Sequence, residues 1–123
     1  MLENAISNDI LPTLENFKNK TFVIKYGGSI LNNIDAQKAF IEDVAKFKHH
    51  GINIVLVHGG GPEINRWLQK AGVESKFIKG LRVTDSATME IVEMVLSGSV
   101  NKKLAANFSC YGLNAVGLSG RDC

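Results

Sequence analysis

Two glycine-rich segments and one lysine are the parts of this sequence best suited to binding anions. Lys25 comes just before Gly27 and Gly28, and His58-Gly59-Gly60-Gly61 follows further along the chain. Successive backbone N–H groups in a glycine turn form a concave anion site, and a helix that begins there adds partial positive charge. Both segments therefore predict contact with phosphate or carboxylate groups.

The spacing of these glycines excludes the common nucleotide-binding signatures. The sequence has neither G-x-x-x-x-G-K-[ST] nor G-x-G-x-x-G, so a Walker loop and the usual dinucleotide fingerprint are not predicted. Residues 58–61 match the H-G-G-G oxyanion motif of esterases, which also requires a G-x-S-x-G nucleophile elbow. The nearest candidate, residues 117–121, has arginine in place of the last glycine. An esterase is therefore disfavoured.

Alternating strands and helices must position the two glycine segments. Residues 21–26 and 53–57 are rich in β-branched and aromatic side chains, and each run leads into a glycine turn, which is typical of buried strands. Apolar residues at helical spacing lie between the two runs, and Gly51 is suited to end that helix. These residues are Ala36, Phe40, Val44 and Phe47.

The second half of the sequence continues the alternation. Pro62 suits the first turn of a helix that runs to Gly72, and residues 75–83 favour an extended hairpin. Asp85 is expected to cap a long helix that ends near Gly112. Its apolar face is expected to include Ala87, Ile91, Val95 or Met94, Leu104 and Phe108.

A third strand is predicted over residues 113–118. The resulting β-α-β-α-β order predicts an α/β fold with an open, mainly parallel sheet sandwiched by helices and joined by right-handed crossovers. Ligands of such sheets bind outside the carboxyl ends of the strands, where both glycine segments occur. Residues 1–18 form an amphipathic leader, with Ile6, Ile10, Leu14 and Phe17 on one helical face, and Pro12 should kink or divide it.

Composition excludes several classes of partner. The 123 residues carry a formal net charge of +2 with no basic stripe, so nucleic acid is not expected. The apolar runs are too short to cross a bilayer, and no signal peptide is recognisable. The two cysteines, Cys110 and Cys123, lack metal-ligand spacing, so no metal site is predicted and both are expected to be ordinary thiols.

Four blocks of sequence, in this order, resemble the acetylglutamate kinases of the amino-acid kinase family. They are Val23-Ile24-Lys25-Tyr26-Gly27-Gly28, His58-Gly59-Gly60-Gly61-Pro62, Lys79-Gly80-Leu81-Arg82-Val83-Thr84 and Val100-Asn101-Lys102-Lys103. The resemblance implies an amino-acid-kinase-like fold. It also implies that residues 19–123 are an N-terminal, acetylglutamate-binding lobe and that the C-terminal nucleotide-binding lobe is absent, so that the chain alone is expected to be inactive.

The resemblance assigns a role to six residues. Lys25 contacts the phosphoryl oxygens as the catalytic residue, and Gly27 and Gly28 bind phosphate through backbone N–H groups. Gly60 and Gly61 hold N-acetyl-L-glutamate through main-chain N–H groups. Arg82 pairs with the α-carboxylate of this acceptor, for which a planar two-pronged donor is better suited than lysine.

The implied reaction is phosphate transfer from ATP with Mg²⁺ as co-substrate to the side-chain carboxylate of N-acetyl-L-glutamate, a step of arginine biosynthesis. No tightly bound cofactor is expected. The resemblance also implies a homo-oligomer in the full-length form, and a cytoplasmic or plastid stromal location. A PII-type regulatory protein as partner is left open. Two alternatives remain, a non-catalytic binding or assembly fragment and a kinase for a different amino acid.

Overall fold

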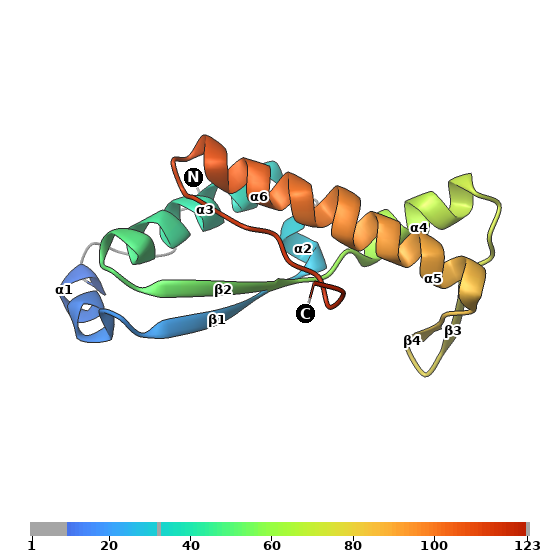
Figure 1. Ribbon diagram of the computed structural model, residues 1–123, viewed down its shortest axis with the longest axis horizontal. Coiled ribbons are helices and arrows are strands. Elements are labelled where there is room, and N and C mark those ends of the chain that lie inside the picture. The colour runs from blue at the N-terminus through green and yellow to red at the C-terminus, as the bar shows by residue number, and fades with distance from the viewer. Residues whose placement is uncertain (1–9, 32, 123) are drawn as a thin grey trace. The chain divides into compact units, whose positions relative to one another are not determined.

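The computed structural model of the protein describes residues 10–31 and 33–122 (Figure 1). The chain divides into two compact units, and each is described by itself below. The first comprises the described part of Met1–His58 together with Cys110–Leu113. The second comprises Gly59–Ser109 and the described part of Asn114–Cys123.

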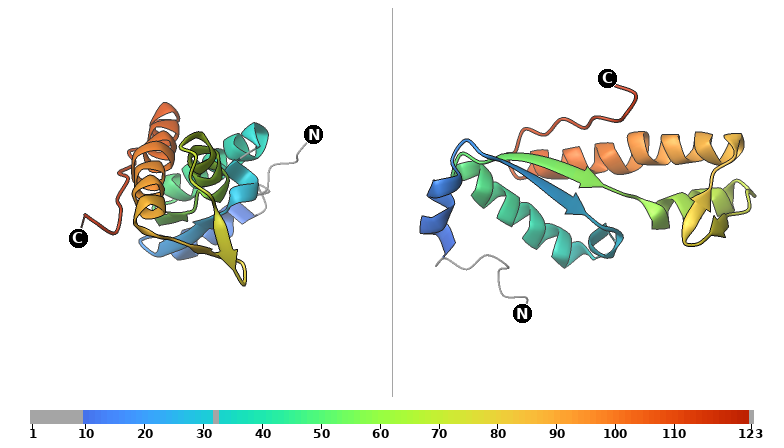
Figure 2. Two further views of the ribbon diagram at one scale, coloured as in Figure 1. Left: turned by 90° about the vertical axis from the view of Figure 1, so that its right-hand side faces the viewer. Right: turned by 90° about the horizontal axis from the view of Figure 1, so that it is seen from below.

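The first unit is a parallel β-α-β arrangement, as the sequence predicts. Strands β1 (Thr21–Tyr26) and β2 (Asn53–His58) pair in parallel, and α3 (Ile34–His49) connects them and packs against β2 (Figure 2). The side chain of Asn33 caps α3 by accepting a hydrogen bond from the Ala36 N–H at 3.0 Å. The expected stop at Gly51 is confirmed, because this residue has a φ of +74°.

The core of this unit lies between the sheet and α3. Along β1, Phe22, Ile24 and Tyr26 are the more buried residues, and they alternate with exposed ones. Tyr26 is only 2% exposed, and its ring lies 4.9 Å from that of Phe40 on α3. Burial raises the pKa of the Tyr26 phenol. Lys25 therefore belongs to the opposite, solvent-facing side of the strand.

The described part of the leader consists of two short helical turns, α1 (Leu11–Leu14) and η2 (Glu15–Phe17). Pro12 lies in the first turn of α1, where a missing N–H costs no hydrogen bond. Leu14 is buried, whereas Ile10 and Phe17 are exposed, although Phe17 makes an edge contact with Phe22. Ile6 lies outside the described residues.

The second unit consists of a helix, a hairpin and a long, composite helix. The hairpin expected over residues 75–83 is confirmed, and Lys79 and Gly80 form its two-residue turn with positive φ at both positions. The elements are α4 (Gly61–Lys70), β3 (Lys76–Ile78), β4 (Leu81–Val83), α5 (Ser86–Glu93), η3 (Met94–Val100) and α6 (Asn101–Cys110).

The long helix begins as predicted but is not α-helical throughout. The carboxylate of Asp85 accepts a hydrogen bond from the Thr88 N–H at 2.8 Å, which confirms the cap. The middle segment, η3, is a π-helix, whose wider turns displace the apolar face from strict α-helical spacing. Val95 is buried and Met94 is 61% exposed, so the first of the two alternatives for this position is the correct one.

The predicted strand over residues 113–118 is not formed, and these residues run without a strand partner. Side chains of α6 bind this segment instead. Lys102 Nζ donates to the Gly117 carbonyl at 2.8 Å, and Asn101 Nδ2 donates to the Leu118 carbonyl at 3.1 Å. Among the described residues, the parallel sheet therefore has two strands, because two carbonyl groups of the third run accept hydrogen bonds from side chains and its backbone joins no ladder.

We expect Gly117→Ala to lower the free energy of unfolding by about 1–3 kcal/mol, the range for overpacking. A Cβ at this position would lie 1.8 Å from Asn101 Oδ1, so the buried amide would have to move. The measurement is urea unfolding, with Gly120→Ala as the control because a Cβ there meets no atom within 4 Å. Equal unfolding midpoints for the two variants would contradict the packing argument.

The cap at Asp85 predicts a pH-dependent contribution to stability. The hydrogen bonds from Thr88 lower the pKa of the Asp85 carboxyl, so its contribution is present above the unfolded pKa of about 3.9 and is lost as the pH falls through the lower, folded value. The difference in melting temperature between wild type and Asp85→Ala should shrink across that acidic range. Ser86→Ala, an exposed change on the same helix that removes no ionisable group, should show no such trend.

Candidate functional site

The amino-terminal end of α4 is built around a glycine that has no room for a side chain. Gly60 precedes α4 and is buried, and its carbonyl accepts from the Ile64 N–H at 2.9 Å. A Cβ on Gly60 would lie 2.7 Å from Leu96 Cδ2 and 3.2 Å from Val100 Cγ2. Its φ of −174° is an ordinary extended value, so the requirement for glycine is one of space.

Gly61 is the exposed first residue of α4, and a Cβ there would meet no atom within 4 Å. The first N–H groups of a helix have no acceptor within the helix, and Pro62 contributes no N–H at all. The N–H of Gly61 therefore stands at an open surface, at the positive end of a ten-residue helix. An anion can approach this backbone closely.

The hairpin holds Arg82 against α4. The Arg82 guanidinium donates one hydrogen bond to Ser75 Oγ at 2.9 Å and another to Asn65 Oδ1 on α4. Its central carbon lies 4.7 Å from the centroid of the Phe77 ring. Both acceptors are neutral, and no carboxylate of the described residues forms an ion pair with Arg82. Its positive charge is therefore uncompensated.

Arg82 is bonded to α4 about one turn beyond the glycines. Asn65, which accepts from the guanidinium, comes four residues after Gly61, which is about 6 Å along the helix axis. Three predicted substrate-binding residues, Gly60, Gly61 and Arg82, thus belong to the second unit, and α4 links them.

The one acidic residue in the first turn of α4 is paired. Glu63 accepts hydrogen bonds from Arg66, with 3.0 Å between Arg66 Nε and Glu63 Oε2. The hydrogen bond from Arg66 lowers the pKa of the Glu63 carboxyl, and the charge of Lys103 lowers it further. Glu63 is therefore ionised but neutralised by its neighbour, so it opposes an incoming anion less than a lone carboxylate would.

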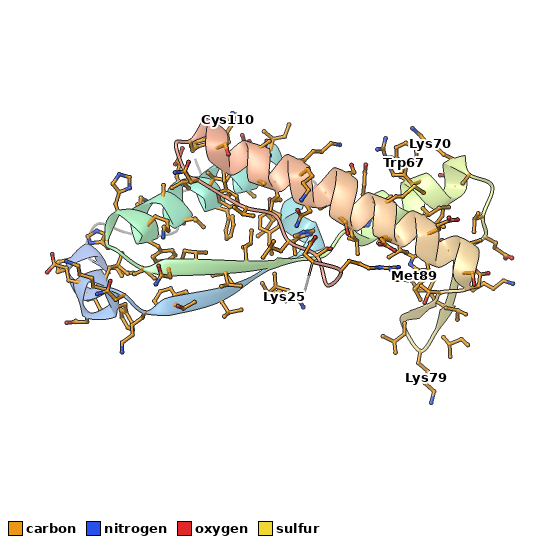
Figure 3. The ribbon with its side chains drawn as sticks, in the orientation of Figure 1. Lys25, Trp67, Lys70, Lys79, Met89 and Cys110 are labelled. Atoms are coloured by element: carbon orange, nitrogen blue, oxygen red, sulfur yellow. The ribbon has the colours of Figure 1, made fainter. Side chains whose placement is uncertain are left out.

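The other predicted residues lie in the first unit. Lys25 is exposed near the carboxyl end of β1, opposite Val57 in the sheet register (Figure 3). Gly27 follows the strand, with open space where a Cβ would be, and Gly28 begins the four-residue helix α2 (Gly28–Leu31). This turn offers an exposed ammonium group beside a backbone that a phosphate can approach.

Three residues that support Arg82 were not singled out from the sequence. Arg82 is separated by seventeen positions from Asn65, by seven from Ser75 and by five from Phe77. The contact with Asn65 forms because the hairpin lies against α4. A polar residue on the exposed face of a helix carries no signal of such a contact. Phe77 could have been found by assigning the register of the hairpin, because it pairs with Arg82 across β3 and β4.

The described residues contain neither a membrane-spanning helix nor a cluster of metal ligands. No helix among residues 10–31 and 33–122 is both long and apolar enough to cross a membrane. Within the same ranges, no group of three or more His, Cys, Asp or Glu residues is arranged to hold a metal ion. Cys110 is an exposed free thiol, and Cys123 lies outside the described residues.

Acetylglutamate kinases from several bacteria are similar to this chain. That of Clostridium acetobutylicum is 60% identical over 114 residues, which are 93% of this chain and 39% of the relative. That of Sulfurihydrogenibium sp. is 51% identical over 117 residues, with the same two shares. That of Mesorhizobium japonicum is 48% identical over 121 residues, or 98% of this chain and 41% of the relative. The chain thus spans about two fifths of the length of these curated relatives.

The fold of this chain is similar to that of two solved structures. The crystal structure of smu.665 from Streptococcus mutans UA159 has a TM-score of 0.73 and 31% sequence identity, covering 81% of this chain and 40% of that one. N-acetylglutamate synthase from Neisseria gonorrhoeae, complexed with coenzyme A and N-acetyl-glutamate, has a TM-score of 0.59, covers 85% of this chain and 24% of that one, and at 21% identity supports the fold alone. Residues 20–123 match the amino acid kinase family. This match, together with the strand–glycine–helix order and the parallel sheet of the chain, establishes that the chain belongs to the amino acid kinase family.

Proposed function

We propose that this chain forms the acceptor-binding part of an acetylglutamate kinase, which transfers phosphate from Mg-ATP to the side-chain carboxylate of N-acetyl-L-glutamate. The observation that carries the proposal is the uncompensated guanidinium of Arg82, which Asn65 holds against α4. The names of the relatives, at 48 to 60% identity, support the choice of substrate.

The acceptor would bind through groups of two kinds. The guanidinium of Arg82 receives the α-carboxylate, because its planar fork matches a carboxylate in geometry and charge. The backbone N–H groups of Gly60 and Gly61 receive an oxygen of the same molecule at the positive end of α4. Arg82 is bonded to α4 about one helical turn beyond Gly61, so the two groups can serve different ends of one small molecule.

The reaction requires little acid or base catalysis. A side-chain carboxylate with a pKa of about 4.3 is already ionised at neutral pH. One of its oxygens attacks the γ-phosphorus, the bond to the bridging oxygen of ADP breaks, and an acyl phosphate and ADP result. The difficulty is repulsion between an anionic acceptor and an anionic triphosphate, so the protein must supply positioned cations and backbone donors.

Lys25 is proposed as the catalytic residue that donates to the transferring phosphoryl oxygens. Its exposed ammonium follows from its place on the solvent-facing side of β1, two residues before Gly27. Gly27 and Gly28 leave room for the phosphate to reach backbone N–H groups. ATP and Mg²⁺ enter as co-substrate, and contacts to the nucleotide base are proposed to come from sequence that the relatives have and this chain does not span.

For that reason we propose that the 123-residue chain by itself binds the acceptor weakly and turns over ATP little or not at all. Binding is therefore the property to measure in this chain. The homo-oligomer, the PII-type partner, the place in arginine biosynthesis and the compartment stay predictions of the sequence analysis.

N-acetyl-L-glutamate should raise the melting temperature of the chain, because a ligand that binds only the folded state stabilises it by about 2.7 kcal/mol at a hundredfold excess over Kd. L-Glutamate, which has an ammonium group in place of the amide, should raise it less. Arg82→Ala should weaken binding by about 10- to 100-fold, the loss expected for hydrogen bonds to a charged group. If the chain unfolds cooperatively and neither ligand changes its melting temperature, a non-catalytic assembly fragment would be favoured over an acceptor-binding chain.

Gly60→Ala and Gly61→Ala should separate packing from ligand binding. The first change collides with Leu96, so it should lower the free energy of unfolding by about 1–3 kcal/mol. The second meets open space and should leave the melting temperature unchanged, but its methyl group would occupy the surface that the acceptor approaches. Unfolding curves and calorimetric Kd values measure the two effects. A Gly61→Ala variant that binds like wild type would place the acceptor elsewhere.

A further inference from the structure

The guanidinium of Arg82 is held on three sides by groups without charge. Ser75 Oγ and Asn65 Oδ1 each accept from a different terminal nitrogen, and the ring of Phe77 lies 4.7 Å from the central carbon. These contacts come from the loop before the hairpin, from α4 and from β3. The group is therefore fixed in orientation by separate elements of the second unit.

The neutrality of the two acceptors matters for anion binding. A carboxylate in either place would compensate the guanidinium and compete with an incoming anion, and the ligand would first have to displace it. A hydroxyl and an amide oxygen orient the group and leave its charge available. An arginine side chain also has many rotamers, and fixing it before the ligand arrives lowers the entropy cost of binding.

We propose that Asn65 and Ser75 are positioning residues, which orient Arg82 for capture of the acceptor's α-carboxylate without touching the acceptor themselves. The inference rests on the proposed function, because it takes that carboxylate as the ligand of Arg82. Asn65 also fixes the distance between the guanidinium and the backbone of Gly61, and so the length of acceptor that can reach both.

The test is a double-mutant cycle on the 123-residue chain. Asn65→Ala should raise the Kd for N-acetyl-L-glutamate about three- to tenfold, the loss expected for one hydrogen bond. In an Arg82→Ala background, the same change should leave the Kd unaltered, because Asn65 acts only through the missing guanidinium. Chemical-shift titration reaches the weak affinities of the double variant. A Kd raised by the same factor in both backgrounds would overturn the positioning role.

Two matched variants control for general effects. Gln69→Ala truncates another exposed amide on α4 and should bind like wild type. Ser75→Ala should raise the Kd as Asn65→Ala does, whereas Ser75→Thr keeps the hydroxyl and should restore binding. The melting temperatures of all variants identify any that fail to fold. If Ser75→Thr folds but does not restore binding, the result counts against the proposal.

A second readout needs no ligand. Hindered rotation should give separate ¹⁵N–¹H signals for the Nη groups of Arg82 in wild type, and Asn65→Ala should average them. Signals already averaged in wild type would show that the guanidinium is not held and would overturn the inference. If the wild-type chain does not bind N-acetyl-L-glutamate, the proposed function and the positioning role both fail. If wild type binds and Asn65→Ala binds equally well, only the positioning role fails.

Discussion

The close approach of the Gly60 backbone to Leu96 and Val100 is the contact on which the second unit depends. A single added Cβ would lie 2.7 Å from Leu96, so the start of α4 can sit against η3 only because residue 60 is glycine. This contact fixes the first turn of α4, which carries the open N–H of Gly61 and leads directly to Asn65, whose side chain binds Arg82. Packing and anion recognition are therefore set by the same few atoms.

Charge is distributed around that turn so that an anion is favoured. The helix end is partly positive, Arg82 is held by neutral acceptors, and the nearby Glu63 is neutralised by Arg66. Each arrangement alone is common on protein surfaces and would mean little. Together they favour an anion near the start of α4, and the proposed acceptor site rests on this combination.

The sequence predicted local structure well wherever one residue type has one physical role. Gly51 ends α3, Asp85 caps α5, and a hairpin forms within residues 75–83, because positive φ, side-chain capping and a short turn depend on neighbours in the chain. The π-helical segment and the unpaired run at residues 113–118 were not predictable in this way. Both depend on what lies beside them in space, as do the contacts of Asn65 and Ser75 with Arg82.

The π-helical segment also constrains how this chain can change in evolution. A π-helical turn closes i→i+5 hydrogen bonds, so it holds about one residue more than an α-helical turn. Loss of one residue from η3 can therefore be absorbed by conversion of the segment to α-helix, and α6 would keep nearly its present rotation relative to α5. A further inserted residue would instead turn α6 by about 100°, and Asn101 and Lys102 would then face away from the carbonyls of Leu118 and Gly117, which they now bind. This segment can thus lose a residue more readily than it can gain one.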